Sequence, residues 1–372
     1  MKILYVTTVS ITMGFFPAHI KMLQAEGHTV ELACNLDEPL PEKTSVLNCP
    51  AHHVPFSRSP LSRENITAYR KLKRLLAENH YDIVHTHTPN ASALVRLACR
   101  KLRSQGMKVF YTAHGFHFYD GAPPANWLLF YPVEWLCSHW TDVLITINRE
   151  DHARAQKRFH AKQTAYIPGV GVDTAQFGCH NTRDAKRQEL GIPADAKVLL
   201  TVGELNENKN QSVILRAMAK LNDPNLHYVL CGQGEYDGIL RKLAEDLRLS
   251  DRVHLLGFRR DVPEICPAAD LYLCPSFREG LNVSIMEAMA SGLPVICSDI
   301  RGNRDLVVYD KGGRLCRPDD AEGFAASIQT LAASPERCQA MGTHNRAFVD
   351  RFSVQQVLVK LQQIYNVSNS SE

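Results

Sequence analysis

Residues 271–290 read LYLCPSFREGLNVSIMEAMA, and this stretch decides the fold class. Residues 271–274 form an apolar run of strand length, and residues 283–290 carry apolar side chains at helical spacing, with a glycine-containing turn between the two. A buried strand that passes through such a turn into a helix is the repeating unit of parallel α/β sheets. Ligands of these sheets bind at the carboxyl ends of the strands, so the turn marks a candidate site.

The same alternation of apolar runs and helical segments fills both halves of the 372-residue chain. In the first half we expect strands at 3–7, 29–33, 83–86, 108–112 and 143–146, and helices at 62–79 and 91–103. In the second half we expect strands at 198–202, 227–231, 253–256, 271–274 and 295–298, and helices at 211–221, 238–247 and 283–290. About five strands in each half favour two Rossmann-like α/β domains, with a single (β/α)₈ barrel as the alternative.

The boundary between the two domains is predicted at residues 167–173, which read IPGVGVD and interrupt the strand–helix alternation with one proline and two glycines. We therefore expect an N-terminal domain over 1–170 and a C-terminal, nucleotide-binding domain over 171–351. The last segment, 352–372, has a helical pattern and is expected to return to the N-terminal domain.

Composition indicates a soluble globular protein, with 45% hydrophobic and 22% charged residues. The net charge of +3 is too small to indicate a nucleic-acid partner. Residues 1–170 carry 19 Lys and Arg against 13 Asp and Glu, an excess that suits an anionic partner such as a lipid surface, or that arises by chance. The eleven cysteines form no CxxC pair, which is typical of reduced thiols in the cytoplasm.

The turn at 275–282 has the properties of a diphosphate site. The first backbone amides of a helix lack intrahelical acceptors and point, with the positive end of the helix dipole, at a bound anion. The amides expected to do so belong to Gly280, Leu281, Asn282 and Val283. Glu287 lies about one turn into the helix, where a carboxylate can bind the hydroxyls of a ribose, and Glu279 lies in the loop that faces the sugar. A capping acid and a solvated helix acid are the structural alternative.

The pattern Ser-x-x-Glu-Gly-x₆-Glu-Ala-Met-Ala-x-Gly-x-Pro-Val at 276–295 resembles the donor-site motif of glycosyltransferase family 4. The resemblance extends to residues 82–87 (DIVHTH), 112–115 (TAHG) and 202–205 (VGEL). The wording of residues 114–119 (HGFHFY) is most similar to the bacterial exopolysaccharide and capsule branch. The resemblance implies a GT-B fold, which has two Rossmann-like domains and a deep interdomain cleft, and sugar transfer with retention and without a metal ion or other cofactor.

The resemblance also implies a role for individual residues. Glu279 corresponds to the acid that contacts the transferred sugar and stabilises its positive charge, and Glu287 to the acid that binds the ribose. Lys209 corresponds to the cation that neutralises the leaving diphosphate, and His114 to the histidine that hydrogen-bonds the donor sugar. Gly14, after the first strand, corresponds to the glycine that lets the backbone approach the donor phosphates.

One position departs from the family pattern, and one histidine is assigned less specifically. Glu204 stands where the family usually has an arginine. Either the helix amides and Lys209 suffice for the phosphate site, or Glu204 turns away and orients Lys209. His87 is assigned to the acceptor side, although a histidine at a strand end is more often structural. Of the 16 histidines, only His85 and His87 have ligand spacing, so we expect no metal site.

The function implied is transfer of a sugar from a nucleotide-diphosphate donor, with UDP favoured, to a saccharide acceptor carried on polyprenyl diphosphate, in cell-surface polysaccharide synthesis. A UDP-sugar epimerase of the same fold, a sugar phosphorylase and a non-catalytic nucleotide-sugar-binding protein are the alternatives. We expect a cytoplasmic enzyme, peripheral on the inner face of the membrane.

Aromatic residues gather at 116–140, where Trp127, Tyr131 and Trp135 recur at four-residue spacing. This spacing predicts one face of a helix. The face either packs in the core or contacts a membrane surface, assisted by the basic segments 70–74 and 96–108.

Overall fold

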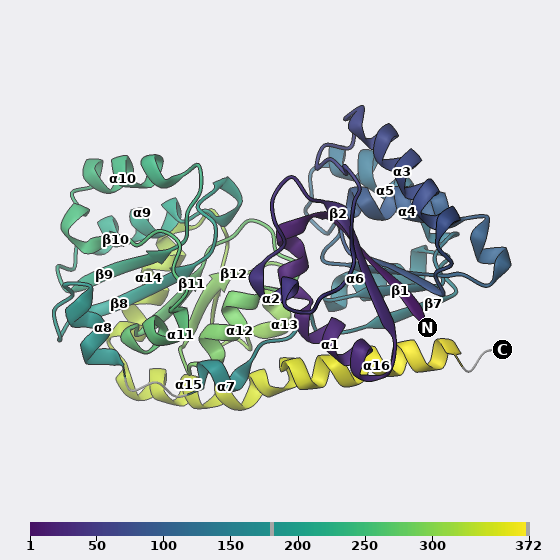
Figure 1. Ribbon diagram of the computed structural model, residues 1–372. Helices are drawn as coiled ribbons and strands as arrows, with labels where there is room; N and C mark the ends of the chain where they lie inside the picture. Colours follow the sequence, from purple (N-terminus) through teal and green to yellow (C-terminus); the bar gives the residue numbers. More distant parts are fainter. Residues whose placement is uncertain (179–181, 370–372) are drawn as a thin grey trace. The chain divides into compact units, whose positions relative to one another are not determined.

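The computed structural model describes residues 1–178 and 182–369, which form two compact units. Unit 1 comprises Met1–Val170 with Gln355–Glu372, and unit 2 comprises Gly171–Val354 (Figure 1). The boundary after residue 170 is the predicted one, and the end of the chain belongs with unit 1 from residue 355. Of the predicted C-terminal segment, residues 370–372 lie outside the described residues.

Unit 1 is built on a seven-stranded parallel sheet with the order β3-β2-β1-β4-β5-β6-β7. Its strands are β1 (Lys2–Val9), β2 (Thr29–Asn35), β3 (Ala51–His53), β4 (Ile83–Thr86), β5 (Lys108–Ala113), β6 (Val143–Thr146) and β7 (Gln163–Tyr166). The chain runs outward from β1 to β2 and β3, then returns to place β4 on the other side of β1. The loops after β1 and β4 therefore diverge at a topological switch point.

Helices cover both faces of this sheet. One face carries α3, α4, α5 and α6, and its core joins Leu4 and Val84 of the sheet to Leu72 of α3 and Val95 of α4. The other face is contacted by α16, whose Tyr365 packs on Phe110. The bounds in unit 1 are η1 (Ser10–Phe15), α1 (Pro17–Ala25), α2 (Glu42–Ser45), α3 (Glu64–Glu78), α4 (Pro89–Cys99), η2 (Leu102–Gln105), α5 (Pro124–Ser138), α6 (Arg149–Arg158) and α16 (Val354–Asn369).

Unit 2 has a six-stranded parallel sheet with the order β10-β9-β8-β11-β12-β13. Its strands are β8 (Lys197–Val202), β9 (Leu226–Cys231), β10 (Val253–Leu255), β11 (Leu271–Cys274), β12 (Val295–Ser298) and β13 (Gly313–Cys316). Its helices are α7 (Thr174–Phe177), α8 (Arg183–Glu189), η3 (Glu207–Lys209), α9 (Ser212–Leu221), α10 (Asp237–Asp246), η4 (Ser250–Arg252), α11 (Val262–Ile265), η5 (Cys266–Ala268), α12 (Val283–Ala290), α13 (Asn303–Leu306), α14 (Ala321–Ala332), α15 (Pro335–Val349) and η6 (Asp350–Phe352). The switch point of this sheet lies between β8 and β11.

The ten predicted strands all form, and β4, β6, β11 and β12 have the predicted bounds. Three strands were not predicted: β3, β7 and β13. Each of them is an edge strand of its sheet. Edge strands bury less surface and so carry fewer apolar residues, which removes the signal that the prediction used.

The prediction that Trp127, Tyr131 and Trp135 share one face of a helix is wrong. Trp127 and Tyr131 of α5 turn inward and pack against Phe118, at ring-centroid distances of 5.5 and 5.3 Å. Trp135, by contrast, is 40% exposed. A four-residue step turns a helix by about 40° beyond a full turn, so three such positions drift off one face.

Helix α16 is anchored to unit 1 by apolar packing and by one buried polar contact. Val357, Leu361 and Tyr365 are fully buried, and the Tyr365 hydroxyl lies 2.7 Å from His85 Nδ1. The other ring nitrogen of His85, Nε2, lies 2.8 Å from the Thr112 hydroxyl. Both polar atoms of the buried imidazole are thus satisfied, one of them by the C-terminal helix.

The packing of α16 can be tested with a matched pair of substitutions on the same helix. We expect Leu361→Ala to lower the free energy of unfolding of unit 1 by about 2–5 kcal/mol, because it removes a fully buried side chain. Val359→Ala should have little effect, since Val359 is 50% exposed. All three tryptophans lie in unit 1, so urea unfolding followed by tryptophan fluorescence measures this unit. Equal effects of the two substitutions would contradict the packing of α16.

Candidate active site

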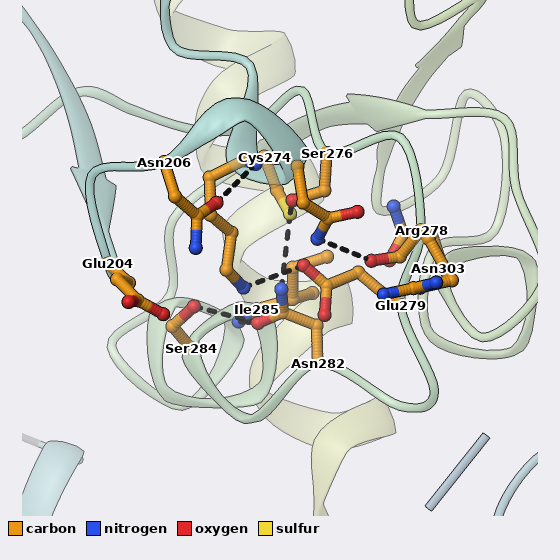
Figure 2. A network of polar contacts seen from close by, with 12 residues as sticks. Glu204, Asn206, Cys274, Ser276, Arg278, Glu279, Asn282, Ser284, Ile285 and Asn303 are labelled. Carbon is orange, nitrogen blue, oxygen red and sulfur yellow. Dashed lines mark hydrogen bonds and ion pairs between the residues drawn. The ribbon is translucent and has the colours of Figure 1, made fainter. Parts of the chain in front are cut away.

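Two loops of unit 2 meet at the switch point between β8 and β11. The loop after β8 contains Asn208 and Lys209, and the loop after β11 contains residues 277–279. The Phe277 amide donates to the Asn208 carbonyl at 2.8 Å, and the Asn208 side-chain amide donates to the Arg278 carbonyl at 3.0 Å. The third contact joins Lys209 Nζ to Glu279 Oε1 at 2.7 Å. Figure 2 shows the surroundings of Glu279, with Asn206 and Asn282 nearby. The predicted lysine and acid are therefore brought together by two adjacent backbone-anchored contacts.

The loop after β8 is held in place by asparagines that the prediction did not single out. The Asn206 carboxamide oxygen accepts the Lys209 amide at 3.0 Å and caps the short helix η3. Asn210 has a left-handed backbone with φ of 53°, and its side chain donates to the Pro275 and Pro318 carbonyls at 3.1 and 2.8 Å. Asparagine is among the residues that tolerate this backbone conformation best. The sequence NENKN at 206–210 was the available signal, because clustered asparagines indicate tight turns.

The Lys209–Glu279 pair is largely shielded from water, with side chains 23% and 13% exposed. Burial by itself disfavours the ammonium, but the Glu279 carboxylate outweighs it, so the pKa of Lys209 is raised above its ordinary value. Lys209 therefore carries its charge across the neutral range, and it lies against an anion in a partly desolvated site.

Glu204 is exposed and does not position Lys209 through its side chain. Its backbone carbonyl accepts a hydrogen bond from the Gln211 carboxamide at 2.9 Å. Its carboxylate raises the pKa of Lys209 only as a minor contribution, behind that of Glu279. Glu204 thus turns away toward solvent, and Lys209 is oriented by Asn206 and Glu279 instead.

The start of α12 is fixed by Asn282, which is buried and serves as its N-cap. The Asn282 carboxamide oxygen accepts the Ile285 amide at 3.1 Å and the Ser284 hydroxyl at 2.7 Å, and its nitrogen donates to Cys274 Sγ at 3.2 Å. Leu281 is buried as well. The side chains of Leu281 and Asn282 are thus structural, and what residues 280–283 can offer an anion is their backbone amides.

Gly302, in the loop after β12, packs closely against the backbone of Gly280 in the turn, and this contact was not predicted. Its φ is 77°, and a Cβ atom there would lie 2.1 Å from the Gly280 carbonyl oxygen. Only glycine combines this backbone conformation with so close an approach. A lone glycine after a strand is a weak signal in one sequence, which is why the prediction missed it.

Glu287 is half-buried on α12, one turn beyond the cap. It shares a helix stripe with Ser284 and Ser291, which are three residues before it and four after it. The predicted contact of Glu287 with a ribose stays a prediction.

In unit 1, the predicted residues His87 and His114 follow the adjacent strands β4 and β5. His87 Nδ1 lies 3.3 Å from His114 Nε2. The His87 ring is 2% exposed and is enclosed by Phe16 and Tyr5, at centroid distances of 4.1 and 4.8 Å. This burial corrects the acceptor-side assignment of His87, because the ring can support His114 but offers an acceptor almost no surface. His114 itself is only half-buried.

Burial keeps a cluster of histidines in unit 1 neutral. It lowers the pKa of His19 and of His114 to about 4, and it holds the pKa values of His85 and His87 well below the ordinary value. The neighbouring His19 imidazole lowers the pKa of His114 further. His114 therefore presents a neutral ring, in which one nitrogen donates a hydrogen bond and the other accepts one.

Gly14 lies in η1, directly after β1, and is buried. A Cβ atom on Gly14 would lie 3.2 Å from Pro41 Cγ and 3.4 Å from Lys43 Cε. Packing against residues 41–43 thus already favours a small residue here, and the predicted role of Gly14 in donor binding stays a prediction.

Within residues 1–178 and 182–369, no group of three or more His, Cys, Asp and Glu side chains is placed to hold a metal ion. Across the same ranges, none of the helices is both long enough and apolar enough to span a bilayer.

Comparison with known proteins places this site in context. The model of Glycosyltransferase Family 4 matches residues 18–176, and that of Glycosyl transferases group 1 matches residues 182–348. The EpsD protein of Bacillus subtilis (strain 168) is 38% identical over 374 residues, which cover 98% of this chain and 96% of EpsD. The UDP-Gal:alpha-D-GlcNAc-diphosphoundecaprenol alpha-1,3-galactosyltransferase of Escherichia coli is 30% identical over 318 residues, with coverage of 83% and 81%.

Solved structures agree over the full length. Sucrose-phosphate synthase from Thermosynechococcus elongatus has a TM-score of 0.82 at 20% identity and covers 100% of both chains. Anabaena HepE in complex with UDP has a TM-score of 0.81 at 21% identity, over 99% of this chain and 100% of HepE. The two Rossmann-like units, each with a parallel sheet, thus have the GT-B fold, and the family models and relatives define a glycosyltransferase. Within that class, the chain belongs to glycosyltransferase family 4.

The buried histidines should make the free energy of unfolding of unit 1 depend on pH. Their folded-state pKa values lie below the ordinary value of 6.5, so the unfolded chain binds more protons as the pH falls. The stability is full above pH 6.5 and is lost as the pH falls from there towards 4. Each histidine that stays neutral lowers the free energy of unfolding by about 1.4 kcal/mol per pH unit over this window.

Urea unfolding of unit 1, followed by tryptophan fluorescence at pH 7.5 and 5.0, measures this loss. His19→Gln should flatten the dependence, whereas His80→Gln, at an exposed position, should leave it unchanged. Equal stability of the wild type at the two pH values would show that the cluster is not neutral in the folded state.

Proposed function

We propose that this glycosyltransferase moves a sugar from a UDP-sugar, with retention of anomeric configuration and without a metal ion, to a saccharide carried on polyprenyl diphosphate. The proposed role is synthesis of a cell-surface polysaccharide, carried out by a cytoplasmic enzyme at the inner face of the membrane. One observation carries the proposal: the Lys209–Glu279 pair lies at the carboxyl ends of β8 and β11, next to the start of α12.

The charges at this position suit a nucleotide-diphosphate sugar. A diphosphate accumulates negative charge as the bond to the sugar breaks, and a buried ammonium with helix amides stabilises that charge without reorganising. The sugar develops positive charge at the same moment, and a carboxylate beside the sugar stabilises that positive charge. Lys209 and Glu279 supply both charges at one position of unit 2, 2.7 Å apart.

The proposed reaction balances as a substitution at the anomeric carbon. The carbon–oxygen bond to the diphosphate breaks, and the electron pair leaves with the diphosphate near Lys209. The acceptor hydroxyl forms the new bond from the same face, and its proton passes to the departing phosphate oxygen. We assign Glu287 to the ribose, and His114, as a neutral imidazole, to a hydroxyl of the donor sugar.

The relatives favour the donor and acceptor classes proposed. The Escherichia coli relative is named for a UDP-sugar donor and a diphosphoundecaprenol-linked acceptor, and HepE is described in complex with UDP. An acceptor anchored in lipid requires the enzyme to work at a membrane surface, which is the reason for the proposed peripheral location.

The proposed reaction is tested by incubating the protein with a panel of UDP-sugars, with and without a polyprenyl-diphosphate-linked saccharide. We expect one UDP-sugar to be consumed only when acceptor is present, and the new bond to have the anomeric configuration of the donor by proton NMR. Turnover without acceptor would favour the epimerase, and binding without turnover would favour the non-catalytic protein. An inverted product would contradict retention.

The roles of the pair are tested by substitution. We expect Lys209→Ala to lower kcat by about 10²–10³-fold, because it removes the charge that stabilises the leaving diphosphate. Glu279→Gln should lower kcat strongly while UDP still binds, since the proposed contact of Glu279 is with the sugar. Steady-state kinetics and calorimetric titration with UDP measure these effects.

A second ion pair of unit 2 provides the control. Lys220 and Glu322 lie 2.9 Å apart on α9 and α14, with side chains 50% and 81% exposed. Lys220→Ala should change kcat by less than about twofold, because exposed ion pairs contribute little. Unchanged kcat in Lys209→Ala, with the same melting temperature as the wild type, would refute the proposed role of Lys209.

A further inference from the structure

The helix α5 of unit 1 exposes apolar side chains along its outer side. Its inward side carries Trp127 and Tyr131, which pack on the core, and one buried acid, Glu134, which is 7% exposed. Five large apolar side chains face solvent: Leu128 (79% exposed), Leu129 (51%), Val133 (46%), Trp135 (40%) and Leu136 (48%). We call these five residues the α5 face. A surface helix of a globular domain normally turns polar and charged residues to solvent.

A buried ion pair dictates this orientation. Glu134 accepts a hydrogen bond from Arg96 of α4 at 2.8 Å and another from the Tyr111 hydroxyl of β5 at 3.1 Å. The Arg96 side chain is 1% exposed, and its guanidinium lies 4.3 Å from the centre of the Tyr111 ring. Rotating α5 to bury its apolar face would leave Arg96 as an uncompensated buried charge, which is strongly destabilising. The exposure of the α5 face is thus built into the core of unit 1.

The α5 face has no charge of its own but has cations on both sides. Glu134 is the only Asp, Glu, Lys or Arg in the sequence of α5. Beyond the end of α4, Arg100 and Lys101 are exposed, and the Arg100 guanidinium lies 5.9 Å from the Trp140 ring. On the other side, exposed Lys157 and Arg158 of α6 line a pocket of about 430 Å³ together with Trp127 and Tyr131 of α5. In unit 1, α5 packs beside α4, which packs in turn beside α3 (Figure 1).

We propose that the α5 face lies on an anionic lipid bilayer, with its leucines, valine and tryptophan among the acyl chains and the flanking cations at the headgroup phosphates. The inference rests on the proposed function in one respect, namely that an acceptor carried on lipid must be met at a membrane. An apolar helix face bordered by lysine and arginine is the arrangement of interfacial helices, which insert about 5–10 Å. At 15 residues, α5 is too short to span a bilayer and lies in its plane.

The charges favour a bilayer over a second copy of the chain. A symmetric dimer through the α5 face would bring the same patch of each copy together. Arg100, Lys101, Lys157 and Arg158 would then face the corresponding cations of the second copy, and like charges in an interface oppose association. Anionic headgroups attract the same four cations, by about fivefold in affinity for each one near the surface.

The test uses the full-length protein and co-sedimentation with vesicles of phosphatidylcholine alone or with 30% phosphatidylglycerol. We expect binding to the anionic vesicles that weakens at 0.5 M NaCl and is at least about tenfold weaker to phosphatidylcholine. The triple substitution Leu129→Ser, Val133→Ser and Leu136→Ser should lower binding at least about tenfold, since these side chains are already exposed and the fold does not depend on them. Lys157→Ser with Arg158→Ser should lower binding to anionic vesicles only.

A matched control is Ile239→Ser on α10 of unit 2, where the isoleucine is 51% exposed, and it should bind vesicles as the wild type does. Equal vesicle binding by the triple variant and the wild type would overturn the proposal. A wild-type protein that is dimeric and binds no vesicles, together with a triple variant that is monomeric, would overturn it as well. Titration with UDP keeps the two proposals apart. Loss of vesicle binding with UDP binding intact supports the α5 face, whereas vesicle binding without any UDP binding would refute the proposed function alone.

Discussion

At the switch point of a parallel sheet, the chain proceeds from two neighbouring strands toward opposite edges of the sheet. The connections that follow these two strands therefore diverge. In unit 2 the switch point lies between the paired strands β8 and β11, and the loops after these strands contact each other through Asn208, Lys209 and Glu279. Two of these contacts involve backbone atoms, which fixes the ends of the loops before any charge is considered. The ion pair then lies where the amides at the start of α12 are oriented outward. The chemistry of the site thus follows from strand order.

Two of the protein's buried or partly buried ion pairs, Lys209–Glu279 and Arg96–Glu134, differ in how far they are accessible to a ligand. Lys209 and Glu279 retain 23% and 13% exposure, so a ligand can exchange with either partner. Arg96 and Glu134 are sealed, at 1% and 9%, and their contribution is to fix the rotation of α5. Burying the two charges of Arg96 and Glu134 has a desolvation penalty, and the pair fixes the orientation of α5. The same type of interaction therefore supports binding in unit 2 and the orientation of a surface helix in unit 1.

Much of the fold could be predicted because a parallel sheet buries its central strands on both faces, and each such strand is a continuous apolar run. The edge strands β3, β7 and β13 lack this signal and were missed. The pairing of Lys209 with Glu279 followed from the position of each after a central strand. The support from Gly302, the burial of His87 and the outward face of α5 could not be predicted, because each depends on contacts between segments far apart in the sequence. The cap that Asn206 places on the Lys209 amide is local, and the clustered asparagines at 206–210 were the signal for it.

A crystal structure of the protein with UDP bound tests the central claim most directly. The account predicts that the diphosphate lies over the start of α12, with a phosphate oxygen within hydrogen-bonding distance of Lys209 Nζ and the ribose hydroxyls at Glu287. A diphosphate bound at any other place on unit 2, with the Lys209–Glu279 contact undisturbed and remote from it, would contradict the account.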